Sequence, residues 1–136
     1  MNSDNDGVLE AARAIRYYLK DLVIDPAKAG TLDRRIADQL TSRADRTATA
    51  SRLRALLEGQ EDTAWFLNRV LTDKPHYRPP YHQPAYQRDI VSPAGELSQV
   101  EADRYACPVG DYVWYRPDIG TPVPECPDHH IPLARS

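Results

Sequence analysis

The sequence predicts an α+β protein that is mostly α: a bundle of about four helices in residues 1–74, a proline-rich strap in 75–104 and a small β module in 105–136. Three observations lead to this fold class. Apolar residues recur at three- and four-residue steps before Lys74, which is the spacing of amphipathic helices. Eleven of the 12 prolines follow Lys74, and a later run of β-branched and aromatic residues is typical of a strand.

The first two expected helices have clear start signals. Asp4 and Asp6 are available to cap the first helix, and Asp25 followed by Pro26 places a capping residue before a proline at the first helical position of the second. Gly30 lies inside the second pattern, where it can divide the helix in two. The apolar positions are Leu9, Ala12, Ile15, Leu19, Leu22 and Val23 in the first helix, and Ala29, Leu32, Ile36 and Leu40 in the second.

The third helix is expected to begin near Thr47 or Thr49 and to stop at Gly59. Asp62 is available to cap the fourth, which must end before Pro75 because the residue that precedes a proline disfavours the helical conformation. Short connections favour antiparallel neighbours, so we expect a compact bundle. The apolar positions are Leu53, Leu56 and Leu57 in the third helix, and Trp65, Phe66, Val70 and Leu71 in the fourth.

Residues 75–93 contain too many prolines for a helix or a central strand, so this part of the strap is expected to be extended, partly as polyproline II. Two interpretations stay open. The segment is a linker, or it is ordered by Tyr77, Tyr81 and Tyr86, which pack onto the bundle or onto a partner. Residues 95–104 are expected to form one helical turn or an irregular lead-in.

The β module starts from a strand. Residues 112–115 form the β-branched and aromatic run that predicts it. Residues 117–120 carry a turn signal, and Thr121 and Val123 suggest a short edge strand after the turn. This edge strand would lead to the second of two Cys-Pro turns, which contain the only two cysteines of the chain.

Charge and composition limit the classes of function. The net charge is −3. Residues 1–74 hold 12 basic and 12 acidic side chains, and residues 75–136 hold five basic and eight acidic side chains. A mildly acidic chain has no broad attraction to nucleic acid, so nucleic acid is not the expected partner. No apolar run is long enough to cross a bilayer, and the polar N-terminus is unlike a secretory signal, so no membrane association is expected. A cytoplasmic location is the default, where cysteines are thiols or metal ligands rather than structural disulfides.

The two Cys-Pro turns have the spacing of metal-binding knuckles. Structural zinc takes four Cys or His ligands in a tetrahedron, and Cys-x-x-Cys or Cys-x-x-His supplies two of them from one tight turn. The sequence from Cys126 to His129 fits that spacing. The sequence from Cys107 to Gly110 has the same length, but glycine occupies the position of the second ligand.

Residues 105–133, with both Cys-Pro turns and the aromatic strand between them, resemble a zinc-ribbon or rubredoxin-like module. The resemblance implies two knuckles around one zinc ion per chain, with Cys107, Cys126 and His129 in three of the four ligand positions. Gly110 departs from the family pattern at the fourth. The resemblance implies a structural or binding role. An iron centre of the rubredoxin kind needs four thiolates, and the chain has two cysteines.

Several residues could complete the site. Asp111 adjoins the glycine, His130 adjoins His129, and His76 or His82 could reach the ion from the strap. A water in the fourth position would leave the zinc open, which is the arrangement of catalytic zinc. Two other interpretations remain: a ribbon that is held together by packing without a metal, or a disulfide between the two cysteines.

The aromatic strand is expected to contact a partner. A module this small has little interior, so at least one of Tyr112, Trp114 and Tyr115 is expected to anchor a partner, with Arg116 beside them.

The helical half is similar to a second family. Residues 12–23, 32–37 and 64–66 resemble small death-domain-like modules that accompany proteases and signalling NTPases in bacterial conflict systems. That resemblance implies an adaptor whose helical face recruits a matching module. The arginines of this half are interspersed with aspartates, so they are expected to form an ordinary solvated face. These arginines are Arg34, Arg35, Arg52 and Arg54.

The expected function is that of a non-catalytic adaptor or regulatory protein, which binds a protein partner through the bundle and carries a structural metal ribbon. Metal ligation explains Cys107 and His129 with fewer assumptions than a nucleophile and its base. Two alternatives come from other classes. A nucleic-acid-binding ribbon would use the aromatic strand and Arg116, and a small zinc-dependent hydrolase would use Asp111 or Asp128 as its base.

Overall fold

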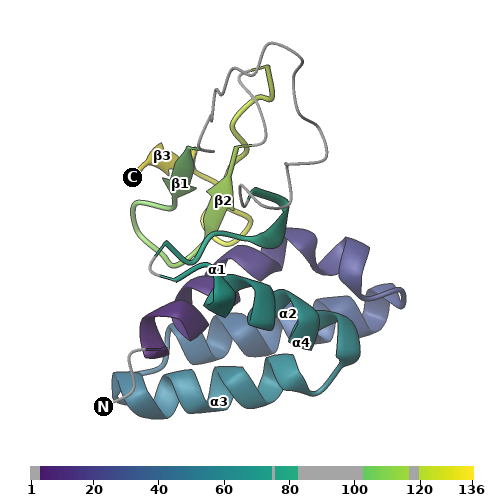
Figure 1. Ribbon diagram of the computed structural model, residues 1–136. Coiled ribbons are helices and arrows are strands. Elements are labelled where there is room, and N and C mark those ends of the chain that lie inside the picture. Colours follow the sequence, from purple (N-terminus) through teal and green to yellow (C-terminus); the bar gives the residue numbers. More distant parts are fainter. Residues whose placement is uncertain (1–3, 75, 83–102, 117–119) are drawn as a thin grey trace.

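The computed structural model describes residues 4–74, 76–82, 103–116 and 120–136. Within these ranges the chain folds into four helices and a small three-stranded antiparallel sheet, so the expected α+β, mostly α class is confirmed (Figure 1). The helices are α1 (Asn5–Leu22), α2 (Pro26–Leu40), α3 (Arg46–Glu58) and α4 (Glu61–Thr72), followed by the short 3-10 helix η1 (Pro80–His82). The strands are β1 (Arg104–Ala106), β2 (Val113–Tyr115) and β3 (Ala134–Arg135).

The central helix of the protein is α1. It contacts α2, α3, α4 and β2, and Figure 1 shows the strands and α3 on opposite sides of it. Its expected apolar stripe is buried because the other three helices cover it. The fully buried centre of the main core includes Ile15, Ile36, Leu53, Phe66 and Leu67.

The ends of the helices follow local capping chemistry. α2 starts as expected: Asp25 accepts a hydrogen bond from the backbone N–H of Ala27 (2.9 Å), and Pro26 occupies the first helical position. α3 begins earlier than expected, because the Asp45 carboxylate accepts the N–H of Ala48 (3.1 Å). α1 has no side-chain cap hydrogen bond, and the expected capping aspartate of α4 lies inside its first turn. α2 is continuous through Gly30, so this glycine does not divide the helix in two.

The sheet has the strand order β2-β1-β3. β1 pairs with β2 in a register that sets Arg104 opposite Tyr115, and β3 pairs with the other edge of β1. The prediction of an edge strand at residues 121–123 is wrong, because these residues form no strand. Within the described residues 120–132, pairing is limited to an isolated bridge between Glu125 and Pro132. Neighbouring prolines lack the N–H groups that a longer ladder needs.

Alternate side chains of β2 belong to two different cores. Val113 and Tyr115 join the main core with the helices, whereas Trp114 joins a second cluster with Cys107 and Cys126. This division follows from the two-residue period of a strand, which directs successive side chains to opposite faces. β2 therefore connects the helical core to the two Cys-Pro turns.

A buried carboxylate on α1 fixes the sheet to the helix. Glu10 accepts hydrogen bonds from Nε and Nη2 of Arg104 (2.7 and 3.0 Å) and from the Tyr115 hydroxyl (2.7 Å). Burial alone would raise the pKa of Glu10, but the hydrogen bonds and the charge of Arg104 lower that pKa below its ordinary value. Glu10 therefore stays ionised and holds both strands of the β1–β2 hairpin.

Arg16 makes the second link between the helices and the β module. Its side chain is 2% exposed. It donates to both oxygens of Asp33 in α2 (2.7 and 3.2 Å) and to both oxygens of Asp128 in the second Cys-Pro turn (2.8 and 3.1 Å). Burial opposes the positive charge, but these bonds raise the pKa of Arg16 above its ordinary value. The guanidinium also lies over the Tyr112 ring, 5.4 Å from its centroid.

The first part of the proline-rich strap packs onto the bundle. Tyr77 packs against the main core, and the ring of Tyr81 contacts the ring of Tyr18. His82 is buried, and its Nε2 lies 2.9 Å from the Tyr18 hydroxyl. The third expected anchor, Tyr86, lies outside the described residues. Residues 76–82 are therefore an ordered part of the fold.

The burial of His82 predicts a loss of stability in mild acid. Burial lowers the pKa of His82 to about 4, from an ordinary value of 6.5, so the unfolded chain binds the extra proton between these pH values. The imidazole meets the Tyr18 hydroxyl and stacks on the Tyr115 ring. Burial raises the pKa values of both tyrosines, so both stay neutral. We therefore expect the free energy of unfolding, measured with urea, to fall by roughly 2–3 kcal/mol as the pH falls through this range.

His82→Gln is the control for this acid sensitivity. The amide can keep the hydrogen bond to Tyr18 but does not titrate, so its unfolding free energy should change less over the same pH range. An equal loss in both proteins would show that other groups cause it.

Removal of the Arg16 charge should destabilise the fold. Arg16→Met keeps much of the side-chain volume but leaves Asp33 and Asp128 without their donor. Both carboxylates are partly exposed, so water replaces some of these bonds, and we expect a loss of roughly 2 kcal/mol in the free energy of unfolding. Arg46→Met is the matched control, because the ion pair of Arg46 with Asp6 is exposed and should contribute less than about 0.5 kcal/mol. Equal losses in the two variants would contradict the role of Arg16.

Candidate metal centre

The two Cys-Pro turns are closed by similar backbone hydrogen bonds. In the first knuckle, residues 107–112, the N–H of Cys107 donates to the carbonyl of Tyr112 (2.9 Å). In the second knuckle, residues 126–131, the N–H of Cys126 donates to the carbonyl of Ile131 (2.9 Å). Each cysteine therefore begins a tight turn, as the sequence spacing predicts.

Three side chains meet between the knuckles, and they are the three expected ligands. Nδ1 of His129 lies 3.4 Å from Sγ of Cys107 and 3.5 Å from Sγ of Cys126. All three ligand atoms lie within 4.8 Å of one another. Zinc bonds of about 2.3 Å to sulfur and about 2.05 Å to nitrogen, at tetrahedral angles, place sulfur and nitrogen about 3.6 Å apart. The observed separations therefore suit a single metal ion.

Gly110 stands where the sequence pattern expects a second ligand of the first knuckle. A Cβ atom added at Gly110 would lie 2.5 Å from Cε1 and 3.0 Å from Nδ1 of His129, and 3.4 Å from Sγ of Cys107. The imidazole of the second knuckle thus occupies the space that a side chain of the first knuckle would fill. The first knuckle contributes one ligand and the second contributes two.

The site has a buried sulfur side and an exposed imidazole side. Both thiols are buried in a cluster with Trp114 and Leu133, whereas His129 is exposed. Burial raises the pKa of the Cys126 thiol, and the backbone N–H groups of Asp128 and His129 partly oppose this rise. A buried thiolate needs a positive partner, and a metal ion supplies that charge as it displaces the proton.

Asp111 and His130 were the nearest candidates for a fourth ligand, and neither joins the cluster. Asp111 is half-buried, with Oδ1 3.9 Å from Nε of Arg13 in α1. His130 is exposed in the left-handed region (φ 55°), and its N–H donates to the carbonyl of Cys126 (2.7 Å). His82 bonds a tyrosine hydroxyl instead. Among the described residues, the cluster has three protein ligands.

The aromatic residues that we expected at a docking surface are buried. Tyr112, Trp114 and Tyr115 are 6%, 2% and 5% exposed, because α1 covers one face of β2 and the knuckles cover the other. Arg116 is half-buried, and its Nη1 donates to the Tyr105 hydroxyl (3.2 Å). The expectation is therefore corrected: in this structure these residues make internal contacts rather than an exposed anchor.

Arg16 is the residue near the site that sequence reasoning missed. It is 112 positions from Asp128 in the chain, so no local pattern joins the two. The available signal was the place of Arg16 in α1, directly beside the apolar stripe, where a charged side chain needs a partner.

Three comparisons with known proteins ended without a match. No protein-family model matches the chain, and searches of curated proteins and of solved structures found no significant similarity. None of the helices that the structure describes is long and apolar enough to cross a bilayer. Evidence for a function therefore comes from the site itself.

Gly110→Ala should weaken metal binding and leave the fold intact. The added methyl group collides with the His129 imidazole, which is exposed and can turn away, so the metal would keep only its sulfur ligands. We expect at least about tenfold weaker zinc affinity, measured by competition with a chromophoric chelator. Equal zinc affinity in the native protein and in Gly110→Ala would exclude His129 as a ligand.

Gly30→Ala is the matched control. Nothing lies within 4 Å of the Cβ position at Gly30, so zinc affinity should not change. Because alanine favours a helix interior over glycine, α2 should gain up to about 1 kcal/mol.

Proposed function

We propose that this protein is a non-catalytic adaptor whose C-terminal β module is held in place by one zinc ion. The observation that supports the zinc is the convergence of Cys107, Cys126 and His129 at separations that suit a tetrahedral ion. The second knuckle is already fixed to the helices through Asp128 and Arg16. An ion between the knuckles would therefore also fix the first knuckle, in addition to the bonds that Glu10 of α1 makes to the β1–β2 hairpin.

Zinc is the ion that best suits these ligands. Two thiolates and an imidazole are typical of zinc, whereas calcium and magnesium take oxygen ligands. A rubredoxin-type iron centre needs four thiolates, and the chain has two cysteines. Three side chains would hold the zinc, and water or a ligand from outside the cluster would take the fourth position.

The carboxylates near the site favour a structural zinc over a hydrolytic one. Both oxygens of Asp128 accept hydrogen bonds from Arg16, which lower the pKa of Asp128, and Asp111 faces Arg13. A general base needs an oxygen that is free to accept a proton and a pKa near the working pH. Asp128, which is bonded to Arg16 through both oxygens, meets neither requirement.

The burial of the aromatic strand counts against the nucleic-acid alternative. Ribbons that bind single-stranded nucleic acid stack bases on exposed rings, whereas Tyr112, Trp114 and Tyr115 are buried. The net charge of −3 adds no general attraction to phosphate.

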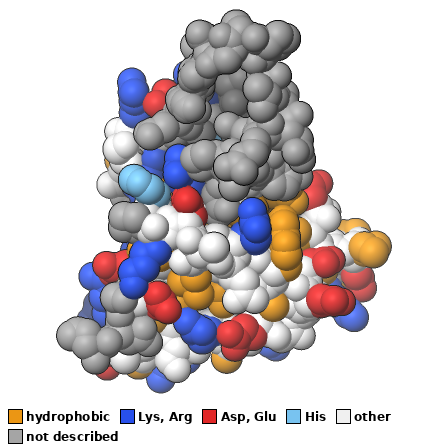
Figure 2. Space-filling model, viewed as in Figure 1, with side chains coloured by type: hydrophobic (Ala, Val, Ile, Leu, Met, Phe, Trp, Pro, Cys, Tyr) orange, Lys and Arg blue, Asp and Glu red, His pale blue; other side chains and the backbone are white. Residues whose placement is uncertain are grey.

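The helical bundle would supply the surface that binds a protein partner. The β module covers only one side of α1, and the outer faces of the helices remain exposed. Figure 2 shows one face of the molecule, on which basic, acidic and hydrophobic side chains lie close together over the helices. Mixed surfaces of this composition suit non-obligate protein interfaces.

Elemental analysis of protein purified without a histidine tag tests the zinc. We expect one zinc per chain in the native protein. Cys126→Ser should lose both the zinc and part of the thermal stability, because metal binding contributes to the free energy of folding. His130→Ala is the matched control, since His130 is exposed and lies outside the cluster. Folded native protein without metal would contradict the zinc centre, and native extracts that yield no stoichiometric protein partner would contradict the adaptor role.

A further inference from the structure

α2 and α3 carry an excess of positive charge in an acidic protein. Residues 26–58 contain seven Lys or Arg and four Asp or Glu, which gives a net charge of +3. The rest of the chain contains ten Lys or Arg and 16 Asp or Glu, which gives a net charge of −6. Aspartates are interspersed with the arginines of these helices, so the sequence predicts an ordinary solvated face. In the structure, however, Asp33 is bound to Arg16 of α1, and Asp45 caps α3.

Five exposed cations of this region make no ion pair with any residue that the structure describes. They are Lys28, Arg34, Arg35, Arg43 and Arg52. By contrast, Arg16 and Arg104 each bond a carboxylate at 2.7 Å. The charge of these five exposed cations is therefore available to a partner.

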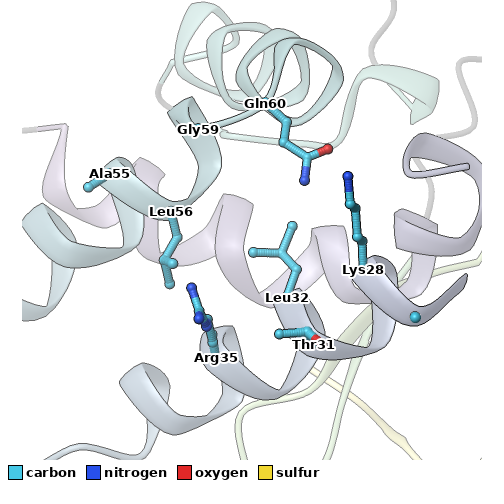
Figure 3. A pocket seen from close by; sticks show the side chains of 9 residues that line it. Lys28, Thr31, Leu32, Arg35, Ala55, Leu56, Gly59 and Gln60 are labelled. Carbon is cyan, nitrogen blue, oxygen red and sulfur yellow. The ribbon is translucent and has the colours of Figure 1, made fainter. Parts of the chain in front are cut away.

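Three of these cations, Lys28, Arg35 and Arg52, border a groove between α2 and α3. The groove consists of two adjoining hollows of about 490 and 470 Å³, both lined by Arg35, Ala55 and Leu56. Figure 3 shows Leu32 of α2 and Leu56 of α3 pointing into the space between the helices, with Lys28 and Arg35 on the α2 side. The groove therefore combines an apolar floor with a mainly basic border, which holds three cations and one carboxylate, that of Asp38.

The groove has the length and the period of a helix-binding surface. α2 contributes lining residues at positions 28, 32, 35 and 39, which span about 16 Å, or three helical turns, at 1.5 Å per residue. Grooves of this kind receive the apolar face of an amphipathic helix through anchors at three- and four-residue steps.

A buried polar atom in the same groove also lacks a partner. Oε1 of Gln39 is shielded from solvent, yet it has no hydrogen bond to any described residue, whereas most such atoms in folded proteins are bonded. Gln39 lines the second hollow together with Arg35 and Arg52. A donor group of a bound chain would satisfy it.

We propose that the groove between α2 and α3 binds an acidic amphipathic helix of a protein partner. Apolar side chains of that helix would cover Leu32 and Leu56, and its Asp or Glu side chains would pair with Lys28, Arg35 and Arg52. A nucleic-acid backbone would meet the cations but leave the apolar floor uncovered, so a protein helix is the better fit. The inference rests on the adaptor role proposed above and states the chemistry of the partner.

A displayed peptide library tests the charge and the shape of the occupant. The peptides are roughly 14 residues long, or four helical turns, with leucine at i, i+4 and i+7 and the other positions drawn from Glu, Lys, Gln, Ser and Ala. Selection on the full-length protein in zinc-containing buffer should enrich Glu over Lys, and the enriched peptide should bind more weakly as the salt concentration rises. No enrichment, or enrichment of Lys, would overturn the proposal.

Substitutions in the groove locate the binding site. The most enriched peptide should bind at least about tenfold more weakly to Arg35→Glu/Arg52→Glu, measured by fluorescence anisotropy. It should also bind more weakly to Ala55→Tyr, which fills the hollow without removing a side chain that the core needs. Arg34→Glu is the matched control, an exposed position of α2 outside the groove lining, where affinity should stay within about twofold. Unchanged binding to both groove variants, with native circular dichroism, would overturn the site.

Other occupants would give different results. A single-stranded oligonucleotide that displaces the peptide and binds more tightly would overturn the proposal in favour of nucleic acid. A dimer in sedimentation that Arg35→Glu/Arg52→Glu dissociates would overturn it in favour of a second copy of the chain. If this variant captures the native partner as well as the native protein does, the groove inference fails while the adaptor role stands. If no form captures a partner, the adaptor role itself fails.

Discussion

One guanidinium group joins the helical bundle to the knuckles. A buried cation is costly without partners, and the two partners of Arg16 come from distant parts of the chain: Asp33 from α2 and Asp128 from the second knuckle. Neither carboxylate can move away without leaving part of the buried charge unsatisfied. The position of α2 against α1 therefore depends on the position of the knuckle. Apolar packing alone would not impose this dependence, because apolar surfaces tolerate small shifts that a directional hydrogen bond does not.

Like Arg16, the elements α1 and β2 each connect the helical bundle with the β module. The apolar face of α1 packs on the helices, and its charged edge meets the β module. Glu10, Arg13 and Arg16 recur at three-residue steps along this edge, and each meets an opposite charge. The partners are Arg104, Asp111 and Asp128. β2 divides its side chains in a similar way, so the cysteine cluster and the main core are separated by a single position in the strand.

Local chemistry made much of this fold predictable, and long-range contacts account for most of the rest. The apolar period located four helices, and the spacing of the Cys-Pro turns located three ligands that the structure brings together, because both patterns lie within a few residues. The burial of Tyr112, Trp114 and Tyr115 was not predictable, since it requires α1 to cover β2. The bond of Asp33 to Arg16 was not predictable either, because it joins two different helices. β3 was missed because two residues are too few to show a period.

The crowding around Gly110 limits how this site can change over evolution. A cysteine at this position would give the first knuckle the ligand pair of a complete ribbon, but its Cβ would enter the space of the His129 imidazole. A side chain at position 110 and the present imidazole of His129 therefore cannot occupy this space together. A side chain at position 110 would reach a bound ion only if the imidazole turned away. A fourth ligand at position 110 would therefore need a smaller ligand than histidine at position 129, which takes two substitutions. The contact between Gly110 and the imidazole thus ties the residue type at position 110 to the residue type at position 129.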